Sequence, residues 1–179
     1  KIKNLKNLPK GIENSLKTEE LIQIFAKDFL SAKGSMFLGR GSSFPIALEG
    51  ALKLKELSYL HAEGYPAGEM KHGPLALIED GLPVIILAPK DKYFEKTISN
   101  MQEVIARGGK VLLISDKHDE VINENIRFKI EMPFIDELLN PFLLTIPLQL
   151  LAYHVALLKK CDIYNPRILV IFVTVYLIF

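Results

Sequence analysis

The sequence predicts an α/β domain of three layers, an α/β/α sandwich in which helices cover both faces of a mostly parallel sheet. Short runs without a charged residue recur at residues 35–39, 83–89 and 111–114. Strands that are apolar throughout are typical of parallel sheets with both faces buried. Segments with apolar residues at helical spacing separate these runs, and this alternation indicates parallel strands joined by crossover helices. Such sheets bind ligands beyond the carboxyl ends of their strands.

The first part of the chain is expected to be a lead-in segment followed by a helix. Residues 1–17 form the lead-in, and Pro9-Lys10-Gly11 should interrupt helical structure within it. Thr18, which is followed by two glutamates, marks the start of a helix. Apolar residues at helical spacing continue to about residue 32, where Lys33-Gly34 ends the helix.

Further helices and one weaker strand complete the expected order. Residues 45–60 form a helix, because proline suits its first turn. Another helix spans 93–106 and ends before a pair of glycines. Residues 127–132 alternate weakly and form a strand, and 141–160 form a long, very apolar helix that contains Pro147.

Composition restricts the partners and the compartment. The chain has 179 residues, enough for one domain with a sizeable core, and a net charge of +1 from 22 basic and 21 acidic residues. It has no dense basic patch, so no nucleic-acid partner is expected. The single cysteine, Cys161, cannot form an internal disulfide, which favours a reducing, cytoplasmic location. No signal peptide is recognised, and because the first residue is Lys1 rather than Met, we expect a piece of a longer protein.

The segment 168–179 is an atypical tail that contains no charged residue. It is too short to cross a bilayer, which needs about 20 apolar residues, so no membrane partner is expected. Its β-branched and aromatic residues should form a buried strand, pack against the apolar helix 141–160, or drive aggregation.

The block 39–74 carries most of the functional information. A strand runs into Gly41, Ser42 and Ser43 at the start of a helix. Hydroxyls beside a glycine suit the phosphate of a substrate there, because free backbone N–H groups and the helix dipole point to this turn. The alternative is that the serines only cap the helix, and the residues leave both interpretations open. A dinucleotide site is not indicated, since Phe44-Pro45 interrupts the longer glycine fingerprint.

Titratable residues follow on the helix and beyond it. Glu49, Lys53 and Glu56 share one helix face, which is either part of a catalytic site or a surface ladder of ion pairs. His72 lies in a stretch rich in Gly, Pro and titratable residues, and a pKa near neutrality suits it to proton transfer. The alternative for His72 is a structural role in the next turn. The block has no recognised metal-ligand spacing, so we expect neither a metal nor another cofactor.

Together these residues are similar to a known family. The most specific stretches are 38–41, 47–56, 61–63, 71–78 and 147–154. They resemble the second of the two SIS (sugar isomerase) domains of glucosamine-6-phosphate synthase, the glutamine–fructose-6-phosphate aminotransferase (isomerizing). The resemblance covers nearly the whole chain and implies a SIS domain with a five-stranded sheet over residues 18–167.

The resemblance also implies a chemistry. The family passes ammonia from glutamine to fructose 6-phosphate and forms glucosamine 6-phosphate, a step of amino sugar biosynthesis. A glutamate that matches Glu56 moves a proton between C1 and C2, with a lysine that matches Lys53 close by. A histidine that matches His72 helps to open the sugar ring in the neighbouring subunit's site, which implies a homodimer. Isomerisation needs such a base to take and return one proton.

Position 171 departs from the family pattern. The family has a lysine there that forms a Schiff base with the sugar, whereas this chain has Ile171, which is no nucleophile. The glutaminase domain and the first SIS domain do not occur in this sequence. We therefore expect a C-terminal fragment that supplies the isomerisation base and a dimer surface, is inactive alone, and works with the rest of the synthase chain. The alternative is a stand-alone, non-catalytic module that binds a sugar phosphate through Ser42 and Ser43.

Overall fold

A sheet of five parallel strands forms the middle layer of the protein, whose computed structural model describes residues 2–116, 126–133 and 135–167. The strands lie in the order β2-β1-β3-β4-β5, and every neighbouring pair is parallel. The predicted five-stranded parallel sheet is thereby confirmed. The strands are β1 (Gly34–Gly39), β2 (His61–Pro66), β3 (Pro83–Leu87), β4 (Lys110–Ser115) and β5 (Phe128–Glu131).

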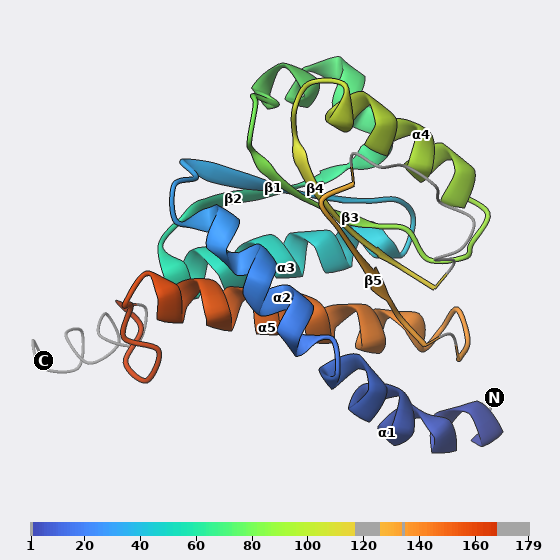
Figure 1. The fold of residues 1–179 in the computed structure, drawn as a ribbon. Helices are drawn as coiled ribbons and strands as arrows, with labels where there is room; N and C mark the ends of the chain where they lie inside the picture. Colours follow the sequence, from blue (N-terminus) through green and yellow to red (C-terminus); the bar gives the residue numbers. More distant parts are fainter. Residues whose placement is uncertain (1, 117–125, 134, 168–179) are drawn as a thin grey trace, which may run out of the picture.

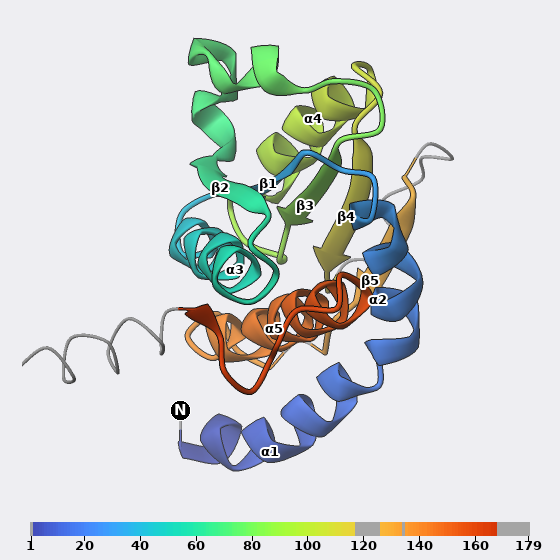
Figure 2. The same ribbon diagram turned by 90° about the vertical axis from the view of Figure 1, so that its left-hand side faces the viewer.

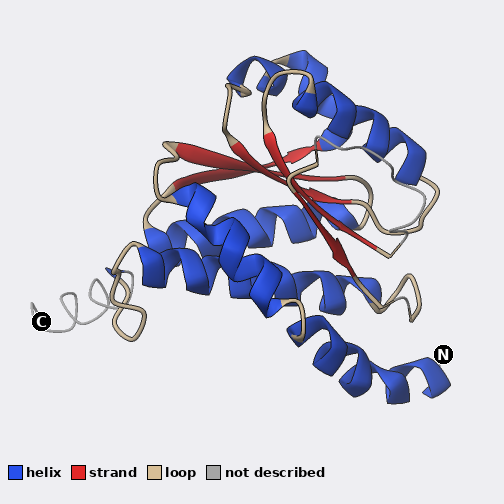
Figure 3. Ribbon diagram, viewed as in Figure 1, coloured by secondary structure: helices blue, strands red, loops and turns tan. Residues whose placement is uncertain are grey.

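Helices cover both faces of this sheet, as predicted (Figure 1, Figure 3). The longer helices α3 and α5 lie side by side on one face, together with α2 (Figure 2). Helix α4 and two short 3₁₀ helices, η2 and η3, cover the opposite face. The bounds are α2 (Glu19–Ala26), η1 (Lys27–Phe29), α3 (Ser43–Ser58), η2 (Ala67–His72), η3 (Pro74–Leu77), α4 (Phe94–Ile105) and α5 (Asn140–Leu158).

The apolar strand residues divide between two cores, one on each face of the sheet. Successive strand residues point to opposite faces. Phe37 and Ile85 accordingly belong to the core beneath α2, α3 and α5, whereas Leu38 and Ile86 belong to the core beneath α4. All four side chains are fully buried. A strand covered on both faces needs apolar residues at every position, which explains the continuous apolar runs in the sequence.

Strand β2 was not predicted, because its sequence resembles a loop. Residues 60–74 are rich in Gly, Pro and titratable groups, and β2 is the edge strand of the sheet, with β1 as its one neighbour. Only Ala62 in this strand is buried, so its apolar pattern is weak. The backbone register with β1, from Gly34 opposite His61 onward, holds the strand in place instead.

The lead-in segment is a helix, α1 (Ile2–Leu16), and the expectation that it would be interrupted at Pro9 is wrong. Proline removes one backbone hydrogen bond from a helix and crowds the preceding turn. Leu8 and Ile12 on either side of it pack against the core, and this packing offsets that loss. Tertiary contacts have therefore overridden the local propensity.

Helix α5 is the most apolar helix of the described residues. By length and composition alone it could cross a membrane, but half of its most apolar 18-residue window is buried inside the protein. It packs against α1, α2 and α3. Its apolar character is that of a helix in a hydrophobic core, where burial on several sides leaves little room for polar residues.

Candidate functional site

The turn between β1 and α3 brings the three predicted phosphate-binding residues to the carboxyl edge of the sheet. Gly41 has a φ of +53°, a backbone conformation that glycine adopts readily. Ser43 N–H donates to the Arg40 carbonyl (3.0 Å) and Phe44 N–H donates to the Gly41 carbonyl (3.2 Å), and Pro45 has no N–H. Fewer helix amides are therefore available to an anion than the sequence suggested.

The two serines do not serve as helix caps in the described structure. Ser42 occupies the N-cap position, but its side chain makes no capping hydrogen bond. Ser43 is 2% exposed, and its Oγ has no hydrogen-bond partner among the described residues. Buried polar groups are normally paired. The alternative in which the serines only cap the helix therefore has no support here.

A cavity of about 340 Å³ lies at this turn, beyond the carboxyl ends of β1 and β3. The turn 41–43 forms one wall, the loop after β3 forms a second, and the start of α5 forms a third. That β3 loop and the α5 start were not predicted as site residues, although ligand sites of parallel sheets form at such strand ends. The lining residues beyond the turn are Pro89, Asp91, Lys92, Tyr93, Glu137, Asn140, Pro141 and Leu144.

Asp116 lies at the carboxyl end of β4 beside this cavity. One carboxylate oxygen accepts a hydrogen bond from Lys90 N–H (2.5 Å), and the other is buried without a partner among the described residues. Burial raises the pKa of this carboxyl above its usual range, and the Lys90 hydrogen bond opposes the rise only in part. The sequence showed no signal for Asp116 beyond its place after an apolar strand.

Lys53 and Glu56 form a close pair on α3. Lys53 Nζ lies 2.8 Å from Glu56 Oε2 and 3.7 Å from Glu49 Oε1. The hydrogen bond to Glu56 and the negative charges of both glutamates raise the pKa of Lys53, although partial burial opposes the rise. The Lys53 and Glu56 side chains are 33% and 26% exposed. The pair is therefore open to a substrate or to another protein surface.

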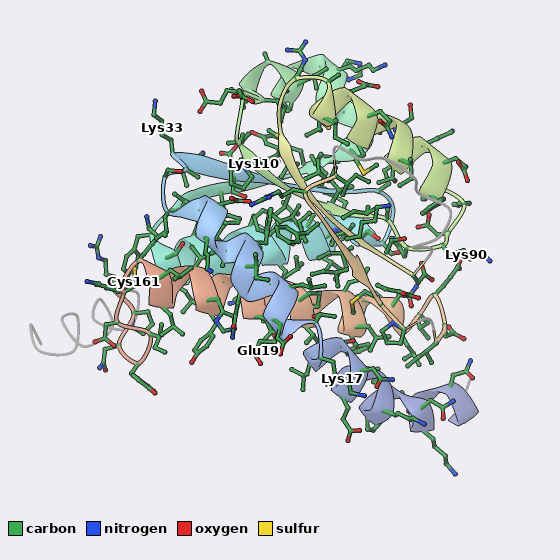
Figure 4. The ribbon with its side chains drawn as sticks, in the orientation of Figure 1. Lys17, Glu19, Lys33, Lys90, Lys110 and Cys161 are labelled. Atoms are coloured by element: carbon green, nitrogen blue, oxygen red, sulfur yellow. The ribbon has the colours of Figure 1, made fainter. Side chains whose placement is uncertain are left out.

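Glu56 and Lys53 do not share the cavity at the turn 41–43 within the described part of this chain. Ser43 begins α3 and Glu56 lies in its last turn, so at a rise of 1.5 Å per residue the two are about 20 Å apart. Cys161 Sγ contacts the Ser58 carbonyl at the Glu56 end. Figure 4 labels Cys161 and, at the cavity end, Lys90, on opposite sides of the molecule.

His72 is likewise separated from the Lys53–Glu56 pair. It ends η2, on the face of the sheet opposite to α3, and its Nδ1 lies 2.7 Å from Glu69 Oε2. The His72 side chain is 72% exposed. It cannot reach Glu56 of its own chain across the sheet, but it is free to contact another molecule.

Arg167 approaches the same end of α3 as Glu56. Tyr59, the C-cap of α3, accepts a hydrogen bond from Arg167 N–H through its hydroxyl (3.0 Å). The Arg167 guanidinium also lies 4.2 Å from the centre of the Tyr59 ring, a cation–π contact. These contacts hold the end of the described chain at the C-terminal end of α3. Ile171 and the rest of the predicted tail lie outside the described residues.

No metal site is found among the described residues. No group of three or more His, Cys, Asp or Glu side chains is arranged to hold an ion within residues 2–116, 126–133 and 135–167.

The chain matches known proteins over nearly its full length. Residues 28–159 match the family model of the SIS domain. Glutamine–fructose-6-phosphate aminotransferases (isomerizing) from Bartonella quintana and Salmonella typhi are 49% and 50% identical over 97% of this chain, and the chain spans 29% of their length. The C-terminal domain of glucosamine-fructose-6-phosphate aminotransferase from Francisella tularensis superposes with a TM-score of 0.86 at 45% identity, over 90% of this chain and 45% of that one. The chain therefore belongs to the SIS domain family and matches the C-terminal region of these aminotransferases.

Proposed function

We propose that this chain supplies the isomerisation base of a glutamine–fructose-6-phosphate aminotransferase. Glu56 takes a proton from C1 or C2 of the open-chain sugar phosphate and returns it to the neighbouring carbon. The observation that carries the proposal is the Lys53–Glu56 pair, held at 2.8 Å on a partly exposed face of α3. The relatives named for this reaction supply the substrate, fructose 6-phosphate.

The lysine beside the base has a defined part in this proposal. Its raised pKa keeps Lys53 protonated at neutral pH. A protonated lysine stabilises the negative charge that develops on the substrate oxygen while Glu56 holds the proton. Lys53 therefore positions and charges the site while Glu56 transfers the proton.

In this proposal the catalytic site is completed by the preceding part of the aminotransferase and by a second copy of the chain. The cavity at the turn 41–43 lies about 20 Å from Glu56, so in this proposal the preceding part of the aminotransferase holds the substrate phosphate at Glu56. His72 lies across the sheet from its own Glu56 and is 72% exposed, which suits ring opening in the site of a second copy. We infer two partners, a second copy of this chain in a homodimer and the remaining synthase domains. We also infer that the assembly is cytoplasmic.

The proposal is tested by joining the chain to the missing domains. The corresponding region of the Salmonella typhi aminotransferase is replaced by this chain, with Ile171→Lys as the reference that restores the family's amine. Conversion of fructose 6-phosphate to glucose 6-phosphate is measured. Glu56→Gln should lower the rate by at least about 100-fold, the usual size of a general-base contribution.

Glu49→Gln is the matched control, because Glu49 also contacts Lys53 but only at 3.7 Å. It should change the rate by no more than about threefold, as expected for an exposed ion pair. Equal losses in the two variants would show that the glutamates form only an ion-pair ladder, and an active Glu56→Gln chimaera would exclude Glu56 as the base.

A second candidate function is favoured by the cavity at the other end of α3. Gly41, Ser42 and Ser43 line a space of about 340 Å³. This space falls in the range of about 300–1,000 Å³ that is usual for small-molecule sites. In this candidate function Gly41, Ser42 and Ser43 bind a sugar phosphate without catalysis, and binding of sugar phosphates to the isolated chain tests it directly.

A further inference from the structure

The place of His72 on the domain is set by the contacts that hold η2. His72 ends this 3₁₀ helix of six residues, and its Nδ1 lies 2.7 Å from Glu69 Oε2 of the same helix. Both side chains are mostly exposed, at 72% and 63%. A contact within one short helix does not fix that helix on the domain, and 3₁₀ helices have poor hydrogen-bond geometry of their own. The anchors of η2 therefore decide where His72 lies.

Burial and one ion pair hold η2 on the side of α4. Ala67 and Met70 are fully buried in the core beneath α4. Lys71 Nζ lies 3.1 Å from Glu103 Oε1 of α4, but the Lys71 side chain is 65% exposed, and exposed ion pairs contribute little stability. These contacts fix the face of η2 that is turned toward α4.

Arg40 holds η2 from the side of the sheet. A Cβ atom at Gly68 would lie 2.5 Å from Arg40 Nη2 and 3.0 Å from Arg40 Cζ, so the guanidinium packs directly against the backbone of η2. A side chain at position 68 would displace it. Glycine is the residue that permits such a close approach to the backbone.

The backbone of Arg40 is fixed by the sheet and by α3. Arg40 follows Gly39, the last residue of β1, whose partner in the ladder with β2 is Pro66. Pro66 directly precedes η2. The Arg40 carbonyl accepts a hydrogen bond from Ser43 N–H at the start of α3 (3.0 Å). Arg40 therefore stands where β1 and β2 end, and its side chain joins η2 to this junction.

The guanidinium occupies this position at a cost in stability. Arg40 Nε is buried and has no hydrogen-bond partner among the described residues. Buried donors are normally paired, and a donor that loses water without gaining a partner destabilises the folded protein. An apolar side chain would fill the same space without this loss. The arginine is therefore explained better by a role in function than by a role in stability.

We propose that Arg40 is a positioning residue that holds η2, and through it His72, in place for ring opening in the site of a second copy. The inference rests on the role proposed above for His72 and adds a residue to it. Lysine does not replace Arg40 here, because its compact ammonium lacks the planar fork of a guanidinium. Since Arg40 acts through His72, its loss slows a cyclic substrate and spares a substrate that has no ring to open.

The first test measures the position of η2 in the full chain, without any substrate. Arg40→Ala should accelerate amide hydrogen exchange of residues 67–72 by at least about threefold, because loss of an anchor favours local opening of this segment. Gly68→Ala should have the same effect, since its Cβ atom displaces the guanidinium. Residues of β4 should keep their exchange rates. Arg107→Ala, which removes an exposed arginine just after α4, is the matched control and should change neither segment.

The second test compares two substrates in the chimaera that carries Ile171→Lys. Fructose 6-phosphate forms a ring, whereas 5-deoxyfructose 6-phosphate lacks the hydroxyl that closes it, and nuclear magnetic resonance follows the isomerisation of each. His72→Ala should slow the first substrate by about 100-fold, the usual contribution of an acid–base group. Arg40→Ala should slow it by at least about tenfold, because a displacement of about 1 Å costs up to about 100-fold in rate.

The second substrate and a double variant separate positioning from other effects. Arg40→Ala and His72→Ala should each change the rate with 5-deoxyfructose 6-phosphate by less than about threefold, because neither touches the proton transfer by Glu56. Arg40→Ala added to His72→Ala should cause no further loss, since the two residues act as one unit. Arg40→Lys should behave like Arg40→Ala, and Glu56→Gln should slow both substrates.

The outcomes separate this inference from the function on which it rests. Equal slowing of both substrates by Arg40→Ala would show that Arg40 binds the substrate or supports the fold, and would overturn the inference. Unchanged exchange in residues 67–72, or a further loss in the double variant, would overturn it as well. In these cases slowing of both substrates by Glu56→Gln, and of the cyclic one by His72→Ala, would leave the proposed function standing. A His72→Ala chimaera that converts both substrates at the reference rate would refute the role of His72 and this inference with it.

Discussion

Replacing Gly39 by alanine should disturb the turn that presents Ser43, because α3 starts directly against this glycine. A Cβ atom at Gly39 would lie 2.4 Å from the Ser43 carbonyl oxygen and 2.9 Å from Phe44 N. An ordinary contact is about 3.5 Å, so the start of the helix would have to move by about 1 Å. Both neighbours are backbone atoms, which cannot rotate away as a flexible side chain can.

The expected cost follows from this displacement. Overpacking of this kind destabilises proteins by about 1–3 kcal/mol. For a domain of this size each kcal/mol lowers Tm by about 2–4 °C, so thermal unfolding followed by circular dichroism should show a decrease of about 2–12 °C. The same movement displaces Ser43 from the cavity, so sugar-phosphate binding should fall even at temperatures where the variant is fully folded.

Gly34→Ala is the matched control at the other end of β1. Its Cβ atom would lie 3.3 Å from the His61 carbonyl oxygen, a distance that needs an adjustment of only a few tenths of an ångström. Its Tm should change by less than that of Gly39→Ala, and ligand binding should not change. If Gly39→Ala kept both the Tm and the binding of the native chain, the close approach of α3 to β1 would not be what positions the site.

Two further changes test other contacts. Asp116→Asn should raise Tm at neutral pH, because burial raises the pKa of the Asp116 carboxyl above 3.8 and so disfavours its charged form in the folded protein. The stability that the protonated carboxyl contributes is complete below the unfolded-state pKa. It is lost as the pH rises through the folded-state pKa. The advantage of the variant should therefore shrink toward acidic pH in paired melting curves, and a gain that is independent of pH would contradict this cause. Tyr59→Leu should accelerate trypsin cleavage after Arg167 several-fold, because both the hydrogen bond and the cation–π contact are lost. Tyr59→Phe, which keeps the ring, should have a smaller effect on the cleavage rate measured by mass spectrometry, and equal rates in all three proteins would show that Tyr59 does not hold Arg167.

The strands and the layer arrangement were predictable, because a strand that is buried on both faces is apolar at nearly every position and this run is visible in the sequence. Every residue of β3 is buried, and so is every residue of β1 and β4 except the first, which explains why these runs contain almost no charged residue. Edge strand β2 has no such apolar run, since Ala62 is its one buried residue, and the strand was therefore not predicted. Helix α1 was missed for the opposite reason: Pro9 is a strong local signal, but packing of Leu8 and Ile12 outweighs it.

The sequence by itself determined how the candidate site residues are spaced along the chain, and only the tertiary structure decided which of them meet. Spacing along one helix was enough to place Lys53 beside Glu56, because residues three apart share a helix face. The distance from Ser43 to Glu56 follows only once α3 is known to be one unbroken helix. Ser43, Asp91 and Glu137 come from segments far apart in the sequence, and the parallel sheet gathers them because its strands all end at one edge.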